Sequence, residues 1–398
     1  MIEPARRTLE MKYAVRDVLC YAEEAKKAGL ELLYLNIGDP NKFDFVTPRH
    51  MIEAVYKAML ANENGYAPSS GVQEARDAIE KEAHRKGLKN IHDIFVTSGV
   101  SECIELCLTA LVNVGEEVMT PSPSYPIYDS VCTKLEAVNV PYYLDEDNNW
   151  NPDIEYIKSK ITPKTRALVL INPNNPTGSI ASLDVLKELI EISIKHNIVI
   201  FSDEIYDKQT FDGKTHTSIA SLTDEAPIIT MNGLSKNYLV PGFRIGWGMV
   251  TGNKQVVGTY VEAINKFLRA RLCAPAPLMF AIKPALEGPQ DHLKEMVEKL
   301  QRRRDITWER LNAIPRISCT KPEAAFYCFP KLDIEESDFD WLVGLIRTTG
   351  VVAVHGSGFG QKPGTKHIRI VFLPPEDILD RAFTHIENYM KKTAGVTG

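Results

Sequence analysis

The 398-residue sequence lacks the patterns that mark several large classes of protein. Its seven cysteines form no CxxC pair, and its nine histidines form no HExxH or HxH cluster, which disfavours a structural zinc site and a metal hydrolase. We therefore expect buried reduced thiols and no metal. No stretch approaches the roughly 18 apolar residues of a membrane span, and residues 1–11 contain no apolar segment of a secretory signal. These absences predict a cytoplasmic protein without a membrane partner.

The sequence also lacks an excess of basic charge. Its formal net charge of −6 gives no overall attraction to nucleic acid, so we expect no nucleic-acid partner. The local cluster Arg302–Arg304 lies in a mixed-charge helical stretch, which favours a solvated helix face over a phosphate site. Nicotinamide dehydrogenases carry a GxGxxG motif after an early strand, and this sequence has none there. The glycines at 356, 358 and 360 differ from the motif in spacing and in position. The sequence therefore disfavours a nicotinamide dehydrogenase.

Hydrophobic segments typical of strands alternate with amphipathic segments typical of helices, which predicts an α/β protein with a largely parallel sheet. Continuous aliphatic segments predict buried strands at 167–171, 198–202, 228–231 and 245–250. Ser182 is expected to cap a helix over 182–196, because its hydroxyl can accept a bond from a backbone N–H. Beyond residue 285, a long charged helix over 290–311 is followed by short strands and a final helix, which predicts a smaller α+β domain.

Four short motifs lie near the ends of these predicted strands. They are Asn172-Pro-Asn-Asn-Pro-Thr-Gly178, Ser202-Asp-Glu-Ile-Tyr206, Asn232-Gly-Leu-Ser-Lys236 and Pro241-Gly-Phe-Arg-Ile-Gly246. An Asn-Pro turn or a Ser-Lys pair alone is common and carries little information. Ligands of open parallel sheets bind at the carboxyl ends of the strands, so four motifs in this order predict one binding site.

Together with Leu35-Asn-Ile-Gly-Asp-Pro40 and Pro121-Ser-Pro-Ser-Tyr-Pro126, these motifs resemble the class I/II aminotransferases, which are fold-type I pyridoxal-phosphate enzymes. Tyr13-Ala-Val-Arg-Asp17 adds to a closer similarity with alanine aminotransferase-like enzymes of archaea and bacteria. The resemblance implies a large domain over 46–285 with a mostly parallel seven-stranded sheet flanked by helices. It also implies a small α+β domain over 286–398, to which segment 1–45 contributes, and a homodimer with shared active sites.

The resemblance implies the cofactor pyridoxal 5'-phosphate and a role for each residue that matches the family. Lys236 matches the lysine that forms a Schiff base with the cofactor and carries the proton. Asp203 matches the carboxylate that keeps the ring nitrogen protonated. Tyr206 and Asn175 match the groups that bond the phenolic oxygen, and Tyr125 matches the aromatic residue that stacks on the ring.

A phosphate needs backbone N–H groups at a helix N-terminus and a fixed cation. The residues that match the family's phosphate site are Gly99, Val100, Ser101, Ser235 and Arg244, joined by Tyr66 from the neighbouring subunit. Many relatives carry a serine three residues before the lysine, where this chain has Gly233, so the source of the hydroxyl stays open.

Arg369 matches the arginine that binds the substrate α-carboxylate, helped by Asn175 and by the backbone of Gly38. The cation for a second carboxylate is left open among Arg16, Arg269 and Arg271. Relatives commonly have Gly-Ala-Phe-Tyr where this chain has Ala324-Ala-Phe-Tyr327, and the added methyl group is expected to perturb the pocket wall. The family also implies cis peptide bonds at 122–123 and 175–176.

The implied reaction is transamination between an amino acid and a 2-oxo acid, with L-alanine and 2-oxoglutarate giving pyruvate and L-glutamate as the first choice. Aspartate is the next donor, followed by aromatic and branched-chain amino acids. A β-lyase shares nearly all of these residues and stays an alternative. A non-catalytic protein of the same fold is disfavoured, because such proteins usually lose the lysine.

Overall fold

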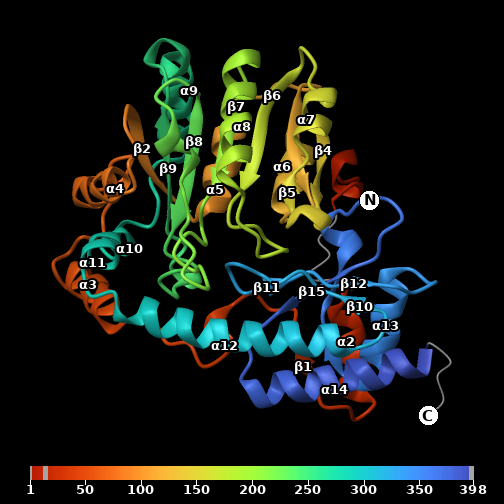
Figure 1. Cartoon of the computed structure of the whole chain (residues 1–398). Coiled ribbons are helices and arrows are strands. Elements are labelled where there is room, and N and C mark those ends of the chain that lie inside the picture. Colours follow the sequence, from red (N-terminus) through yellow and green to blue (C-terminus); the bar gives the residue numbers. More distant parts are fainter. Residues whose placement is uncertain (1, 12–16, 394–398) are drawn as a thin grey trace.

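An eight-stranded mixed sheet forms the centre of the larger part of the molecule in this computed structural model, which describes residues 2–11 and 17–393 (Figure 1). In spatial order the strands are β2 (Ile91–Thr97), β9 (Gly246–Thr251), β8 (Ile228–Gly233), β7 (Val199–Asp203), β6 (Thr165–Ile171), β3 (Glu117–Ser122), β4 (Val138–Asp145) and β5 (Asn151–Pro152). The central strands from β8 to β4 are parallel, whereas β9 is antiparallel to both of its neighbours and β5 to β4. The predicted α/β class is confirmed, and the two-residue β5 adds an eighth strand that is too short to predict.

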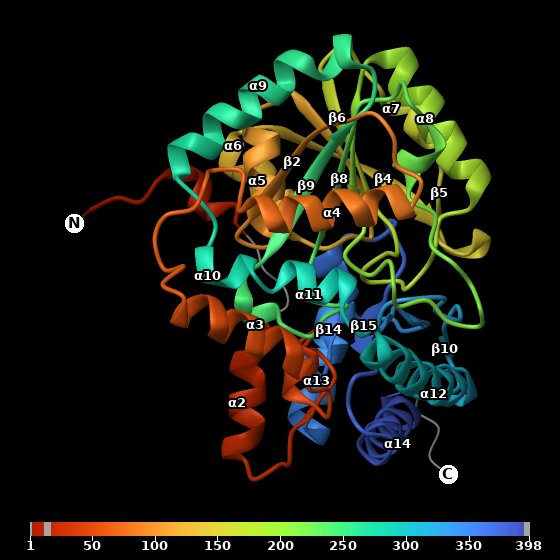
Figure 2. The same ribbon diagram turned by 90° about the vertical axis from the view of Figure 1, so that its left-hand side faces the viewer.

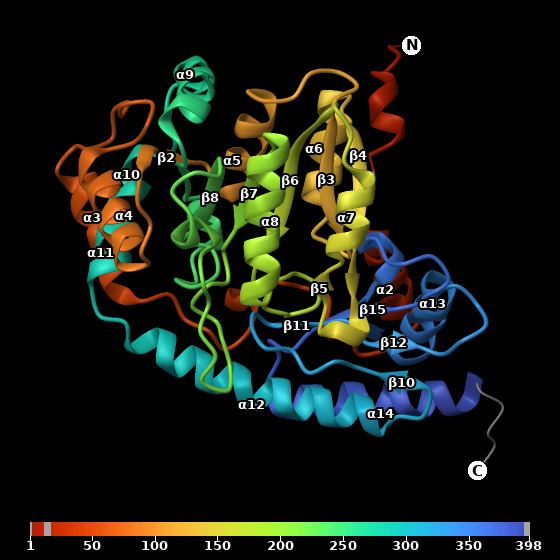
Figure 3. The same ribbon diagram turned by 45° about the horizontal axis from the view of Figure 1, so that its top comes forward.

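Helices cover both faces of this sheet. One face carries α5 (Val100–Thr109), α6 (Ile127–Leu135) and α9 (Lys254–Arg271), and the other carries α7 (Ile154–Lys160) and α8 (Leu183–His196). Figure 3 shows α7 and α8 in front of the sheet, with α5 and α6 behind it. Because side chains alternate along a strand, Leu168 and Ile200 enter one hydrophobic cluster while Val169 and Phe201 enter the other.

The strands predicted at 167–171, 198–202, 228–231 and 245–250 correspond to β6, β7, β8 and β9. Ser182 caps α8 as predicted, and its Oγ accepts a bond from the backbone N–H of Val185 at 3.4 Å. Beside β2, four further helices pack together at the edge of the sheet (Figure 2). They are α3 (Arg49–Leu60), α4 (Gln73–Arg85), α10 (Ala276–Met279) and α11 (Ile282–Glu287).

The smaller part combines residues from both ends of the described chain. Its helices are α2 (Leu19–Lys27), α12 (Asp291–Ala313), α13 (Asp338–Thr349) and α14 (Glu376–Thr393). Its strands are β1 (Leu33–Tyr34), β10 (Ile317–Ser318), β11 (Tyr327–Cys328), β12 (Lys331–Leu332), β13 (Val351–Val352), β14 (Val354–His355) and β15 (Ile368–Val371). The parallel pair β1–β13 joins the N-terminal segment to the C-terminal one, and both share a hydrophobic cluster. The domain boundaries at residues 45 and 285 stay predictions.

Short 3-10 helices complete the secondary structure of the described residues. They lie at Arg6–Leu9, Pro40–Lys42, Glu146–Asn148, Ile219–Leu222, Pro241–Phe243 and Gly356–Phe359. In the ranges that the structure describes, every helix is too short or too polar to cross a membrane.

Two arginines of α12 correct an expectation from the sequence. Arg303 is 1% exposed and Arg304 is 0% exposed, so only Arg302 of the cluster lies on a solvated face. Arg303 donates to both carboxylate oxygens of Asp44 at 2.8 and 2.7 Å. Arg304 donates to both oxygens of Asp212 at 2.9 Å each. The prediction of a solvated helix face was therefore wrong for these two arginines. The charge pattern of one helix cannot reveal partners that come from distant segments of the chain.

Asp212→Asn should lower the stability of the protein, because a neutral amide replaces the carboxylate that accepts two hydrogen bonds from the buried guanidinium of Arg304, which then keeps only Asp305 as an ion-pair partner. Asp212 is itself partly exposed, so we expect a loss of about 1–2 kcal/mol, between the values for exposed and for buried pairs. Urea unfolding would measure the change. Glu309→Gln on the exposed side of α12 is the matched control and should leave the midpoint unchanged. Equal midpoints for Asp212→Asn and the native protein would contradict the prediction.

Candidate active site

A cavity of about 470 Å³ lies at the carboxyl ends of β6, β7 and β8. It brings together residues that are far apart in the chain, from the N-terminal segment to β15. Of the residues predicted for the site, those that line it are Gly38, Val100, Ser101, Tyr125, Asn175, Asp203, Tyr206, Ser235, Lys236, Arg244 and Arg369. Gly99 lies directly beside it at the N-terminus of α5, and Tyr66 lies outside it.

Asp203, the last residue of β7, places a carboxylate against the cavity with only 5% of the residue exposed. Burial raises its pKa to about 6, although two hydrogen bonds act in the opposite direction. Tyr128 donates its hydroxyl to Oδ2 at 3.1 Å, and the backbone N–H of Ile205 donates to Oδ1 at 3.3 Å. A buried carboxylate of this kind is stabilised by a cationic N–H group, which matches the role predicted for Asp203.

Lys236 follows β8 and points its amine across the cavity to the backbone oxygen of Gly38, to which Nζ donates at 2.8 Å. Burial lowers the pKa of Lys236 to about 8, and Arg369 and Arg244 act in the same direction against the carboxylate of Asp39. A larger fraction of this amine is therefore neutral near physiological pH than for an ordinary lysine. A neutral amine is the nucleophilic form.

Arg369 on β15 is fixed by aromatic rings and by backbone. Its guanidinium carbon lies 4.8 Å from the ring centroid of Tyr327 and 4.6 Å from that of Phe359. It donates to the oxygen of Asn36 at 2.8 Å and to Oδ1 of Asn175 at 3.4 Å. A planar guanidinium held in this way suits bidentate binding of a carboxylate.

Tyr206 lies on the same side of the cavity as Tyr327, and their hydroxyl oxygens are 2.9 Å apart. Burial raises the pKa of Tyr206 well above its ordinary value, so the phenol stays protonated at physiological pH. It can therefore donate a hydrogen bond to an oxygen placed in the cavity.

A cation and a helix N-terminus meet at the other end of the cavity. Gly99 precedes α5 with φ of 76°, and a Cβ atom there would lie 2.4 Å from Nη2 of Arg244. Arg244 donates to the oxygen of Pro241 at 3.0 Å and to that of Ser98 at 3.5 Å. Glycine is needed at position 99 because it tolerates this backbone conformation and leaves room for the guanidinium. This arrangement suits a phosphate.

Gly233 has no space for the serine that many relatives carry. A Cβ atom at this position would lie 2.8 Å from the oxygen of Ile245 and 2.9 Å from Cα of Gly246, both of which are backbone atoms. The hydroxyl groups that line the cavity from nearby positions belong to Ser235 and Ser101. Ser235 and Ser101 are therefore the candidates for the protein hydroxyl that binds the phosphate, whose source the sequence left open.

Neither of the two described candidates for the second cation reaches the cavity. Arg269 is not among its lining residues, and Arg271 donates to the oxygen of Val96 at 2.8 Å outside it. The third candidate, Arg16, lies outside the described residues, as do positions 13–15 of the same motif. Among the described residues, the basic side chains that line the cavity are Lys236, Arg244 and Arg369.

Two details of the Pro-rich and small-domain turns differ from expectation. The bond between Ser122 and Pro123 is cis as predicted, but the second cis bond joins Asn172 to Pro173 rather than the predicted residues 175 and 176. The motif contains two Asn-Pro pairs, and local sequence does not distinguish them. Ala324 is fully buried and does not line the cavity, so its methyl group does not form the pocket wall.

Sequence reasoning missed several residues that hold the predicted ones in place. They are Asn36, Asp39, Tyr128, Tyr327 and Phe359. Tyr327 lies inside a motif that resembles the family, and this position could have pointed to it. Nothing in the sequence near Tyr128 connects that residue to Asp203, because the two meet only through the packing of α6 against the sheet.

The chain belongs to the class I and II aminotransferase family, whose model matches residues 31–386. It is 39% identical to the glutamate-pyruvate aminotransferase AlaA of Haemophilus influenzae, with 92% of each chain covered. It is 37% identical to the alanine aminotransferase of Mycobacterium tuberculosis, covering 96% of this chain and 91% of the relative. The solved alanine aminotransferase from Pyrococcus furiosus is 42% identical with a TM-score of 0.95, covering 98% of this chain and 100% of that one. The protein is an aminotransferase, and the predicted family, fold class and cofactor are confirmed.

The lining residues fit the family's cofactor, pyridoxal phosphate. The carboxylate of Asp203 is buried at the edge of the cavity, where it could accept a hydrogen bond from a protonated ring nitrogen. The space beside Gly99, which a Cβ atom would remove, leaves Arg244 next to the N-terminus of α5 for a phosphate. Lys236 lines the same cavity, where its amine is within the space that the predicted covalent attachment requires.

The lowered pKa of Lys236 predicts how the cofactor-free protein takes up pyridoxal phosphate. The rate of uptake should rise with pH through about 8 and then level off, because only the neutral amine attacks the aldehyde. Stopped-flow absorbance in the visible range would follow the reaction, with Lys236→Ala as the control that develops no covalent band. A midpoint near the ordinary lysine value of about 10.4 would contradict the role of burial.

Proposed function

We propose that the protein transfers the amino group of L-alanine to 2-oxoglutarate, which gives pyruvate and L-glutamate. The observation that carries the proposal is the single cavity in which Lys236, Asp203 and Arg369 meet. The choice of alanine is supported by the names of the relatives from Haemophilus, Mycobacterium and Pyrococcus.

Five residues of the cavity have a proposed task in this reaction. When bound, pyridoxal phosphate supplies an electron sink for the pair of electrons left on the substrate's Cα. Arg369 binds the α-carboxylate together with Asn175, and so fixes Cα near Lys236. Nζ of Lys236 takes the proton from Cα and holds it for return. Asp203 holds a proton at the ring nitrogen, and Tyr206 donates a hydrogen bond to the phenolic oxygen.

The residues proposed to bind the cofactor phosphate differ from those proposed to bind the substrate carboxylate, so the two anionic groups do not compete for the same cation. Arg244 and the backbone N–H groups of Val100 and Ser101 are proposed to bind the phosphate, with a hydroxyl from Ser235. Tyr125 is proposed to lie against the ring. Gly38 is proposed to contact the substrate carboxylate through its backbone, beside the amine of Lys236.

Half-reactions with single amino acids should separate the possible donors. We expect alanine and glutamate each to convert the visible absorbance of the bound cofactor to that of its amino form, at least about tenfold faster than aspartate, aromatic or branched-chain amino acids, which corresponds to about 1.4 kcal/mol of barrier. Lys236→Ala should abolish the conversion, because it removes the proton carrier. If neither alanine nor glutamate converts the cofactor, the assignment is wrong. Release of ammonia without a 2-oxo acid acceptor would instead indicate a β-lyase.

We further propose a homodimer in which Tyr66 reaches the phosphate site of the neighbouring subunit. Tyr66 is 87% exposed and lies outside its own cavity, which fits a side chain that acts elsewhere. The nearby helix α3 exposes several large apolar side chains, a feature of interaction surfaces. They are Ile52, Tyr56, Met59 and Leu60. A cytoplasmic location stays a prediction.

Mixed dimers would test the shared site. A subunit with Tyr66→Ala keeps Lys236, and a subunit with Lys236→Ala keeps Tyr66. If Tyr66 acts across the interface, the mixed dimer contains one fully native site and should recover about half of the native activity. Homodimers of each variant are the controls. A mixed dimer no more active than the mean of these controls would place Tyr66 in its own subunit's site or in none.

A further inference from the structure

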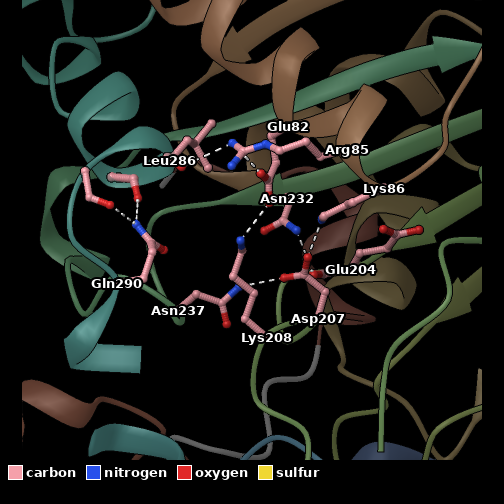
Figure 4. A network of polar contacts seen from close by, with 12 residues as sticks. Glu82, Arg85, Lys86, Glu204, Asp207, Lys208, Asn232, Asn237, Leu286 and Gln290 are labelled. Carbon is pink, nitrogen blue, oxygen red and sulfur yellow. Dashed lines mark hydrogen bonds and ion pairs between the residues drawn. The ribbon is translucent and has the colours of Figure 1, made fainter. Parts of the chain in front are cut away.

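The segment that follows β7 carries functional side chains on two opposite sides. Asp203 and Tyr206 line the cavity. Asp207 instead lines a separate, polar hollow on the far side of the same segment, together with Lys86 from the end of α4. Figure 4 shows this second side, where Asp207 faces Lys86 and Asn237. None of these three residues lines the active-site cavity.

Asp207 joins three segments of the chain through its two carboxylate oxygens. Oδ1 accepts a bond from Nδ2 of Asn237 at 2.6 Å, and Oδ2 accepts one from Nζ of Lys86. The side chain of Asp207 is only 2% exposed, and Asn237 is also buried. Asn237 directly follows Lys236, so the bond ties the cofactor lysine to the segment of Asp203 and Tyr206.

A second bond links the same two segments on the other side of Lys236. Nδ2 of Asn232 donates to the backbone oxygen of Glu204 at 2.9 Å. The carboxylate of Glu204 is held in turn by the hydroxyl groups of Ser202 at 3.0 Å and Ser218 at 2.6 Å. The loop that carries Lys236 is therefore fastened to the Asp203 segment both before and after the lysine (Figure 4).

Asp207 is ionised near neutral pH. Burial alone would raise its pKa, but the charges of Lys86, His216 and Lys208 hold it at about 2. Burial likewise opposes the charge on Lys86, whose pKa is nevertheless raised by Asp207 and Glu204. A group that does not titrate near neutral pH cannot serve as a proton carrier, and its contribution is geometric.

We propose that Asp207 is a positioning residue, which sets the distance from Lys236 to Asp203 and Tyr206 by accepting the hydrogen bond of Asn237. The inference rests on the proposed covalent role of Lys236, but it does not depend on which amino acid reacts. Lys86, which follows α4, donates to the other oxygen of the same carboxylate. It thereby orients the oxygen that accepts the bond from Asn237 and compensates the buried charge of Asp207.

Two double variants isolate the hydrogen bond from the buried charges. Lys86→Met with Asp207→Asn removes both charges and keeps an acceptor for Asn237. Lys86→Met with Asp207→Leu removes both charges and the acceptor as well. Asn237→Ala breaks the same bond from its other end and leaves the ion pair in place. Lys81→Gln with Glu287→Gln is the control, because these residues pair with each other at 3.1 Å between α4 and α11 without contacting Asp207, Lys86 or Asn237.

The variants without the bond should lose kcat by about 10- to 100-fold with little change in KM, because a small displacement of a reacting group is costly for the chemical step. The pH midpoint of the visible absorbance of bound pyridoxal phosphate should also shift in these variants, and this reading needs no amino-acid substrate. The Asp207→Asn double variant and the control should keep the native kcat and midpoint. Circular dichroism melting would verify that each variant is folded.

Each outcome either supports or overturns the positioning role of Asp207. Equal kcat and midpoint in the Asn and Leu double variants would overturn the proposal, as would a native midpoint in Asn237→Ala. If both bond-breaking variants fail to fold, the bond is needed for folding and the positioning role is rejected. If the midpoint shifts as expected while alanine and glutamate fail as donors, Asp207 keeps its role and only the substrate assignment falls.

Discussion

Burying the carboxylate of Asp203 at the end of β7 costs free energy, because an ionised group loses its hydration there. The surroundings compensate only in part: Tyr128 and the backbone of Ile205 donate to it, yet its pKa is still raised to about 6. A cationic N–H group placed in the cavity would complete the compensation. Binding of the cofactor at this point would therefore stabilise the fold, and the neighbouring strands bring the other predicted site residues to the same cavity.

The parallel sheet explains why these residues converge. β6, β7 and β8 end at the same edge, so the residues that follow them meet in one cavity although they are distant in sequence. The turn after β7 then serves two purposes at once. Asp203 and Tyr206 face the cavity, and Asp207 faces the polar network behind it. One short segment therefore carries side chains both for the cavity and for the network behind it.

Patterns of local origin were predictable from the sequence. The strands β6 and β7 consist mainly of continuous apolar residues, and the cap of α8 depends on one serine hydroxyl. Most of the site residues were also predicted, because whole motifs resemble a known family and line the cavity together. Their individual roles stay predictions.

The remainder depends on contacts between distant segments. No local pattern brings Tyr128 to Asp203, or Asp44 and Asp212 to the arginines of α12. The same holds for the ring of Phe359 against Arg369. These pairs form only when the helices and strands pack, so a single sequence without its fold could not indicate them.

The two buried arginines of α12 have a mechanical consequence. Asp44 follows the turn of Gly38, and Asp212 follows the turn of Tyr206, and both turns line the cavity. Adjacent residues of α12 therefore bind both loops, because Arg303 and Arg304 each donate two hydrogen bonds to one carboxylate. A displacement of α12 would therefore move both loops together, so the positions of these two sides of the cavity are mechanically coupled through one helix.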